Sequence, residues 1–184
     1  MAAISPEIRE RVRGYITHQA AKDPAAIRNI VQEGHQQLHA QIDGLSDAQA
    51  SFKPAPDVWS VIEVLRHVED AKRGVARICE MLARGDSPAG FGAEGQAEKR
   101  QLGRTGRGEL ATLGELRDAI ETAHAQLIAF IDAMSDEANT ESRYEHGFFG
   151  MLNCREWAAF QRVHDGDHTR QIEQVKASPG YPAA

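Results

Sequence analysis

Apolar residues recur at spacings of three and four through most of the chain, and no sustained alternation of apolar and polar residues interrupts them. A spacing of three to four residues places side chains on one face of an α-helix, whereas a half-buried strand needs a spacing of two. The pattern therefore predicts an all-α protein.

Capping residues and prolines mark the start of the first two helices. Ser5 before Pro6 predicts a short N-terminal helix, and Asp23 before Pro24 predicts a longer one that ends near Gly44. Proline is favoured at the first helical position because its missing N–H needs no partner there.

Three more helices begin at a capping residue that is followed three positions later by glutamate. The pairs are Ser60 with Glu63, Thr112 with Glu115, and Asn153 with Glu156. In such a pair each side chain accepts a hydrogen bond from the other residue's backbone N–H. These helices should end near residue 84, near residue 134 and before residue 179. The sequence thus predicts four long helices after the short one.

The segments between the helices read as loops. Residues 53–56 should be extended, and residues 135–152 should be irregular. Residues 85–110 contain seven glycines and no periodicity, which predicts one long loop, either a mobile lid or a disordered insertion. A length of 184 residues fits a single domain over residues 1–184.

Composition and charge exclude several classes of protein. Two cysteines are too few for a disulfide framework or a cysteine-rich zinc module. No run approaches the roughly 18 apolar residues of a membrane span, and residues 1–13 are charged, so we expect a cytoplasmic protein. A net charge of −6 argues against nucleic acid as a partner.

The histidines carry the clearest signal of chemistry. His164 and His168 lie one turn apart in the middle of an apolar stripe, a spacing that lets two imidazoles share a metal ion. The alternative is a pair of core histidines that only make hydrogen bonds. His67 lies two turns into the helix that begins after Ser60, where it could supply a third ligand.

Other polar residues are weaker candidates for the site. Gln171 shares the face of His164 and His168, His146 lies in the turn before the last helix, and His35 lies at a core boundary. All three are possible pocket residues, although His35, like His39, is more typical of a solvated or hydrogen-bonded side chain. Asp165 lies near these histidines in sequence and could orient a metal-bound imidazole, but a solvated side chain is the simpler interpretation.

The two cysteines differ in their expected roles. Cys154 lies where a helix N-terminus could lower its thiol pKa, although an unreactive side chain is the simpler interpretation. Cys79 should be a core residue.

Three segments together resemble the DinB-like (YfiT-like) superfamily of metal-dependent enzymes. They are WSVIEVLRH at residues 59–67, HGFFGML at residues 146–152 and HDGDHTRQI at residues 164–172. The resemblance extends from about residue 27 to residue 175. It implies an up-down-down-up four-helix bundle and makes His67, His164 and His168 the ligands of one divalent metal ion. Three imidazoles with open positions are compatible with zinc and with nickel.

Two activities are implied by this resemblance. Some members are thiol S-transferases that use bacillithiol or mycothiol, and others are described as hydrolases. We expect a thiol transferase in stress or detoxification chemistry, acting on a small-molecule substrate with a low-molecular-weight thiol. A metal-dependent hydrolase and a non-catalytic metal-binding bundle are the alternatives. The resemblance also suggests a homodimer, for which Val75, Leu82 and Phe130 could provide an apolar face.

Overall fold

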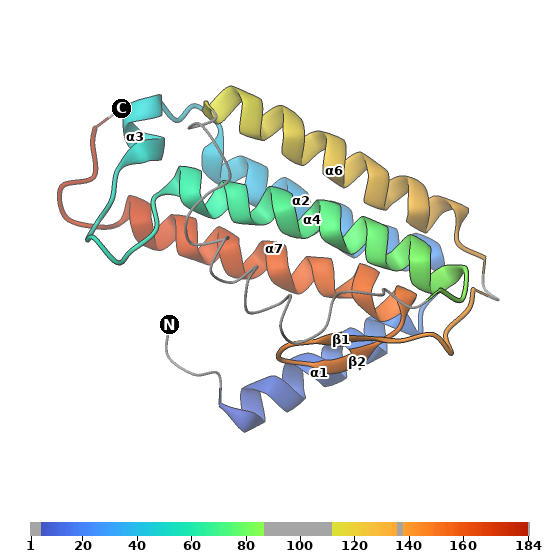
Figure 1. Ribbon diagram of the computed structural model, residues 1–184. Coiled ribbons are helices and arrows are strands. Elements are labelled where there is room, and N and C mark those ends of the chain that lie inside the picture. Colours follow the sequence, from blue (N-terminus) through green and yellow to red (C-terminus); the bar gives the residue numbers. More distant parts are fainter. Residues whose placement is uncertain (1–4, 87–111, 136–137, 184) are drawn as a thin grey trace.

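The computed structural model describes residues 5–86, 112–135 and 138–183, which form six helices and one β-hairpin (Figure 1). The elements are α1 (Pro6–Ala20), α2 (Pro24–Ile42), α3 (Asp47–Ser51), α4 (Val61–Ala83), α6 (Leu113–Ala133), β1 (Tyr144–His146), β2 (Gly150–Leu152) and α7 (Cys154–Lys176). The loop expected at residues 85–110 lies, apart from its first two residues, outside the described part of the chain.

Capping hydrogen bonds define the helix ends at the positions that the sequence predicted. Reciprocal capping boxes open α4, α6 and α7 at Ser60, Thr112 and Asn153. The Asp23 side chain accepts a hydrogen bond from the Ala26 N–H at the start of α2. Gly85 follows α4 with a φ of +84°, the left-handed conformation that glycine adopts at little cost. The predicted helix starts are confirmed.

Four long helices pack as a bundle, and α1 lies along α7. In Figure 1, α2 and α7 run in one direction and α4 and α6 in the other. This is the up-down-down-up arrangement that the resemblance implied. Within the described residues, no helix is long and apolar enough to span a membrane.

Two short elements were not predicted. β1 and β2 pair antiparallel, with Tyr144 opposite Leu152 and His146 opposite Gly150, where the sequence predicted an irregular segment. Each strand has three residues, too few for an alternating pattern to be recognised. The five-residue helix α3 also escaped prediction, although Ser46 and Gln49 form a capping box there.

The hydrophobic core consists of two clusters. The first packs residues such as Val31, Leu127 and Trp157 beside α1 and the hairpin. The second packs residues such as Leu38 and Leu65 at the α3 end of the bundle.

A buried polar layer separates the two clusters. We call the following five side chains the polar layer: His35 on α2, Lys72 on α4, His124 on α6, and Gln161 and Asp165 on α7. None is more than 5% exposed. On each of the four helices, the polar residue falls between the part that joins the first cluster and the part that joins the second.

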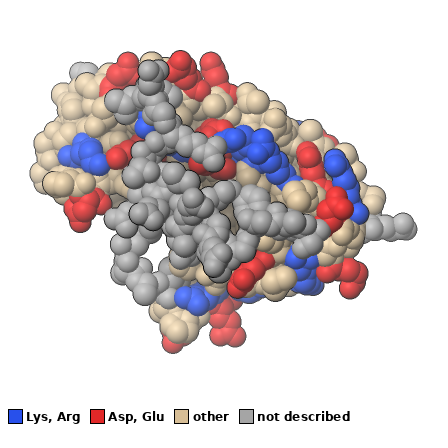
Figure 2. All heavy atoms as spheres, viewed as in Figure 1, with Lys and Arg blue, Asp and Glu red and all other residues tan. Residues whose placement is uncertain are grey.

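The surface differs from the expected dimer face. Val75 and Leu82 are buried in the first core cluster, and Phe130 packs against it, so the apolar face proposed for a homodimer does not exist in that form. On the face shown in Figure 2, acidic and basic side chains are interspersed. The homodimer itself stays a prediction.

Candidate metal centre

The three predicted histidines meet at the seam between α4 and α7. His67 comes from the second turn of α4, and His164 and His168 come from consecutive turns of α7. Their ring centroids lie 4.4 to 5.1 Å apart. The indole ring of Trp59 lies 5.5 Å from the His67 ring and forms one side of the site.

The distances between nitrogen atoms suit a shared metal ion. One ring nitrogen from each histidine lies within 4.8 Å of the other two, and Nε2 of His67 is 3.2 Å from Nε2 of His164. Two imidazole nitrogens on tetrahedral zinc, each at about 2.0 to 2.1 Å, are roughly 3.3 Å apart. The same separation would also fit an N–H···N hydrogen bond between neutral rings, so distance alone does not assign the site.

Hydrogen bonding prepares the His168 ring for coordination. Nδ1 of His168 donates a hydrogen bond to Oε1 of Gln171 at 2.9 Å. This proton position leaves the lone pair on Nε2, and such a partner also holds the ring in place. Gln171, predicted as a pocket residue, therefore orients the His168 ring through the Nδ1 side and leaves Nε2 available. Nδ1 of His164 is buried and has no hydrogen-bond partner among the described residues.

Burial favours the neutral form of all three imidazoles. Burial lowers the pKa of His67 to about 4, with a smaller contribution from His168. Burial and the neighbouring histidines hold the pKa of His164 well below its usual value. The pKa of His168 is also lowered, mainly by burial. Neutral rings offer the lone pairs that a metal ion needs.

An aromatic cluster adjoins the triad. The ring centroid of Phe160 lies 5.7 Å from that of His164 and 4.4 Å from that of His146. Nδ1 of His146 accepts a hydrogen bond from the Phe148 backbone N–H. Trp157 and Phe149 also contact the His146 ring. The predicted pocket residue His146 is thus part of an apolar surface at the edge of the site, to which the hairpin contributes.

An ion pair that the sequence analysis missed lies behind the triad. Nζ of Lys72 donates to Oδ2 of Asp165 at 2.5 Å, and Nε2 of Gln161 donates to Oδ1 at 2.7 Å. The expectation that Asp165 is solvated is wrong, because α7 is buried on more than one side at this level. The signal in the sequence was Lys72, which lies between Val68 and Val75 in an apolar stripe and so needs a buried partner.

His35 lies elsewhere. It is in the polar layer at the seam of α2 and α6, near His39, Glu121 and His124. It does not join the triad as a pocket residue.

Both cysteine thiols are buried in this structure. Burial raises the pKa of Cys154, although backbone N–H groups act in the opposite direction, so the interpretation of a lowered thiol pKa is wrong. The Cys154 thiol donates to the Asn139 carbonyl, and the buried Cys79 thiol donates to the Cys154 carbonyl. Cys79 is a core residue, as predicted.

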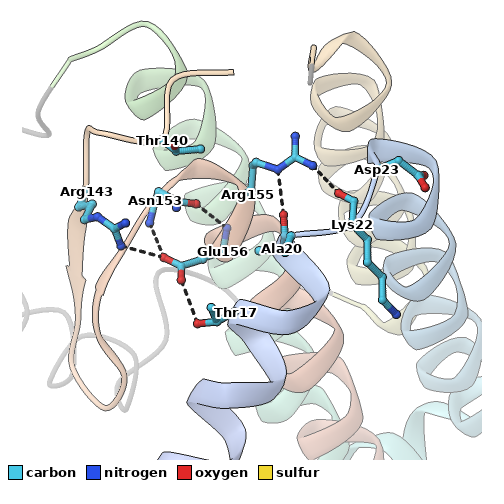
Figure 3. Close-up of a pocket in the computed structure, with 10 residues that line it drawn as sticks. Thr17, Ala20, Lys22, Asp23, Thr140, Arg143, Asn153, Arg155 and Glu156 are labelled. Atoms are coloured by element: carbon cyan, nitrogen blue, oxygen red, sulfur yellow. Dashed lines mark hydrogen bonds and ion pairs between the residues drawn. The ribbon is translucent and has the colours of Figure 1, made fainter. Parts of the chain in front are cut away.

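A cavity of about 560 Å³ lies away from the triad, where α1 ends and α7 begins (Figure 3). Arg155 donates to the carbonyls of Ala20 and Lys22, while Glu156 accepts from Thr17 and Arg143. These pairs join α1 to the start of α7. The polar lining is therefore largely engaged in holding the structure together.

The fold and the histidine site together define a four-helix bundle with a candidate metal centre between two helices. Comparison with known proteins specifies this class further. The family model of the DinB superfamily matches residues 30–172, and the chain belongs to this superfamily, whose members generally bind metal ions.

Individual proteins also resemble the chain, and two examples follow. The uncharacterized protein YuaE of Bacillus subtilis (strain 168) is 24% identical over 157 residues, which cover 80% of this chain and 96% of YuaE. The crystal structure of TT2238, a four-helix bundle protein, matches with a TM-score of 0.60 at 17% identity, over 82% of this chain and 98% of TT2238. The second likeness supports the bundle fold alone.

Proposed function

We propose that the protein binds one zinc or nickel ion through His67, His164 and His168 and uses it as a metal-dependent thiol S-transferase. The observation that carries the proposal is a group of three imidazoles within 4.8 Å of one another. Within the described part of the chain, no carboxylate or thiol joins that group. Three protein ligands with an open position are typical of catalytic rather than closed structural sites.

The residues of the chain have separate tasks in this proposal. The three imidazoles hold the ion, and Gln171 fixes the proton of His168 on Nδ1. A divalent ion held there supplies positive charge that favours the deprotonated form of a thiol. The aromatic cluster around Phe160 and His146 offers an apolar surface beside the triad, which suits an apolar electrophile as the second substrate.

A hydrolase is less well supported by the geometry. Hydrolysis of an ester or amide benefits from a general base that can reach the attacking water. The buried carboxylate next to His164 in sequence is Asp165, and both of its oxygens are engaged by Lys72 and Gln161. We therefore rank hydrolysis below thiol transfer.

Metal content tests the site. Protein purified without a histidine tag should contain less zinc or nickel in the His164→Ala variant than in the wild type, by about one ion per chain. His18→Ala is a matched control, because His18 is exposed on α1. An unchanged metal content in His164→Ala, with intact helical circular dichroism, would contradict the proposed ligand set.

Activity is tested separately. Metal-loaded protein should conjugate at least one thiol from a panel of bacillithiol, mycothiol, glutathione and cysteine to a model electrophile, followed as loss of free thiol. His168→Ala should abolish the reaction. If every thiol fails while the metal is bound, thiol transfer is wrong, and ester hydrolysis by the same sample then separates a hydrolase from a non-catalytic bundle.

A further inference from the structure

A second group of histidines lies at the seam of α2 and α6. His35 and His39 are one turn apart on α2, with ring centroids 4.4 Å from each other. Glu121 and His124 face them from α6. The triad lies at a different seam, between α4 and α7. The two groups are therefore carried by different pairs of helices.

Two histidine nitrogens of this second group converge on one carboxylate oxygen. Nε2 of His35 and Nε2 of His39 each lie 3.1 Å from the same oxygen, Oε1 of Glu121. One ligand atom from each of the three residues lies within 4.8 Å of the other two. Ligands of one transition-metal ion, bonded at about 2.0 to 2.2 Å, are spaced in this way.

Hydrogen bonding alone does not account for the arrangement. His35 Nε2 and Glu121 Oε1 form a hydrogen bond, but the close contact between His39 and Glu121 lacks hydrogen-bond geometry. Nε2 of His39 is accordingly buried without a hydrogen-bond partner among the described residues. A buried nitrogen of this kind is costly unless another partner satisfies it.

The surroundings hold the His35 ring in one orientation and in its neutral form. His35 stacks on His124 with ring centroids 3.6 Å apart and planes 10° from parallel. Nε2 of His124 in turn lies 3.3 Å from Oε1 of Gln32. Burial is the main cause that lowers the pKa of His35 to about 3, and the nearby Lys72 adds to it.

Charge and access are also compatible with a cation. The positive charge of Lys72 acts on His35, but that charge is balanced by the Asp165 carboxylate at 2.5 Å. Glu121 brings a negative charge, and its side chain is 55% exposed, whereas His35 is only 5% exposed. An ion could therefore enter from solvent on the Glu121 side.

We infer that His35, His39 and Glu121 form a second metal site, specific for a divalent transition metal of the zinc class. Two imidazoles and one carboxylate are the ligands that such ions prefer over calcium or magnesium, which favour oxygen alone. The site is independent of the triad, since it shares no ligand with it. Its position would join α2 to α6 at the level of the polar layer.

The number of bound ions tests this inference. Equilibrium dialysis against zinc, followed by elemental analysis, should give two ions per chain for the wild type. The double variant His39→Ala with Glu121→Gln should bind one. The double variant His164→Ala with His168→Ala should also bind one, at the remaining second site. All four substitutions together should leave none.

Controls separate this site from nonspecific binding. Glu33→Gln changes an exposed carboxylate on α2 that is outside the proposed site, and His18→Ala removes an exposed histidine, so both should leave the count at two. If His39→Ala with Glu121→Gln binds as many ions as the wild type, the second site does not exist. The same conclusion follows if the triad variant, folded by circular dichroism, binds no zinc. If the triad variant does not fold, the wild type and the His39/Glu121 variant alone decide: a difference of one ion supports the site, and equal counts overturn it.

Discussion

His35 and His124 stack in the polar layer, and burial lowers the pKa of each to about 3, while that of His67 falls to about 4. The ordinary value is 6.5. As pH falls below that value, the unfolded chain binds protons that the folded protein does not. The stability that these neutral rings provide is complete above about pH 6.5 and is lost as pH falls towards the folded pKa.

Urea unfolding of chelator-treated protein should show this loss. The free energy of unfolding should be lower at about pH 5.5 than at about pH 7.5, with each such histidine contributing a slope of up to about 1.4 kcal/mol per pH unit. His124→Gln should reduce the slope, and the exposed His18→Ala should not. A free energy that does not change with pH would mean that these rings are not buried as described.

The buried ion pair provides a second test at this scale. Lys72→Ala leaves Asp165 buried without its charge partner, and such a change typically costs about 3 to 5 kcal/mol. Arg170→Ala breaks a pair with Asp167 whose side chains are both about two thirds exposed, so it should cost no more than about 1 kcal/mol. Denaturant unfolding of both variants measures the difference. Equal losses would contradict the buried pair.

The residues that sequence could find are those with a local signal. His164 and His168 share one apolar stripe, and His67 stands in a segment that resembles the family. Their convergence is now visible, while metal binding by them stays a prediction. Glu121 carries no such signal, because an exposed glutamate on a helix is ordinary and only the packing of α2 against α6 brings it to His35.

Among the helices, two glycines offer a matched comparison. A Cβ on Gly74 of α4 would have no heavy atom within 4 Å, whereas one on Gly34 of α2 would lie 3.0 Å from Cδ of Arg162 and 3.4 Å from Cβ of Asp165. Alanine is favoured over glycine in a helix by about 1 kcal/mol. Gly74→Ala should therefore raise the free energy of unfolding by up to that amount.

Gly34→Ala should raise the free energy of unfolding by less than Gly74→Ala does, or lower it, because α7 approaches α2 closely at that position. Thermal or urea unfolding of the two variants checks both statements. If Gly34→Ala stabilises as much as Gly74→Ala, the close approach of α2 and α7 is not a constraint.

At the scale of elements, the sequence predicted the features that depend on residues close together along the chain. Capping residues act over three or four positions, so the starts of the long helices were correct. The hairpin depends on pairing between Tyr144 and Leu152 and on a φ of +69° at Gly150. Neither feature leaves a periodic pattern in strands of three residues.

For the whole molecule, bound metal should act as a stabilising ligand. An ion that binds only the folded state adds about 2.7 kcal/mol when its free concentration is one hundred times its Kd. Excess zinc should therefore raise the thermal midpoint of the wild type, and His164→Ala should show a smaller rise. Differential scanning calorimetry with zinc and with chelator measures this. An unchanged midpoint in the wild type would contradict binding to the folded protein.

We expect the polar layer also to fix how the four helices align along their axes. If α4 slid past α7 by one turn, about 5.4 Å, Lys72 would lose Asp165 and both charges would face apolar side chains. Hydrophobic packing alone is more tolerant of such a shift, since one leucine can replace another. Replacing Lys72 with methionine and Asp165 with leucine should therefore leave a folded bundle whose helices sample more than one alignment, visible as broadened amide signals in nuclear magnetic resonance spectra.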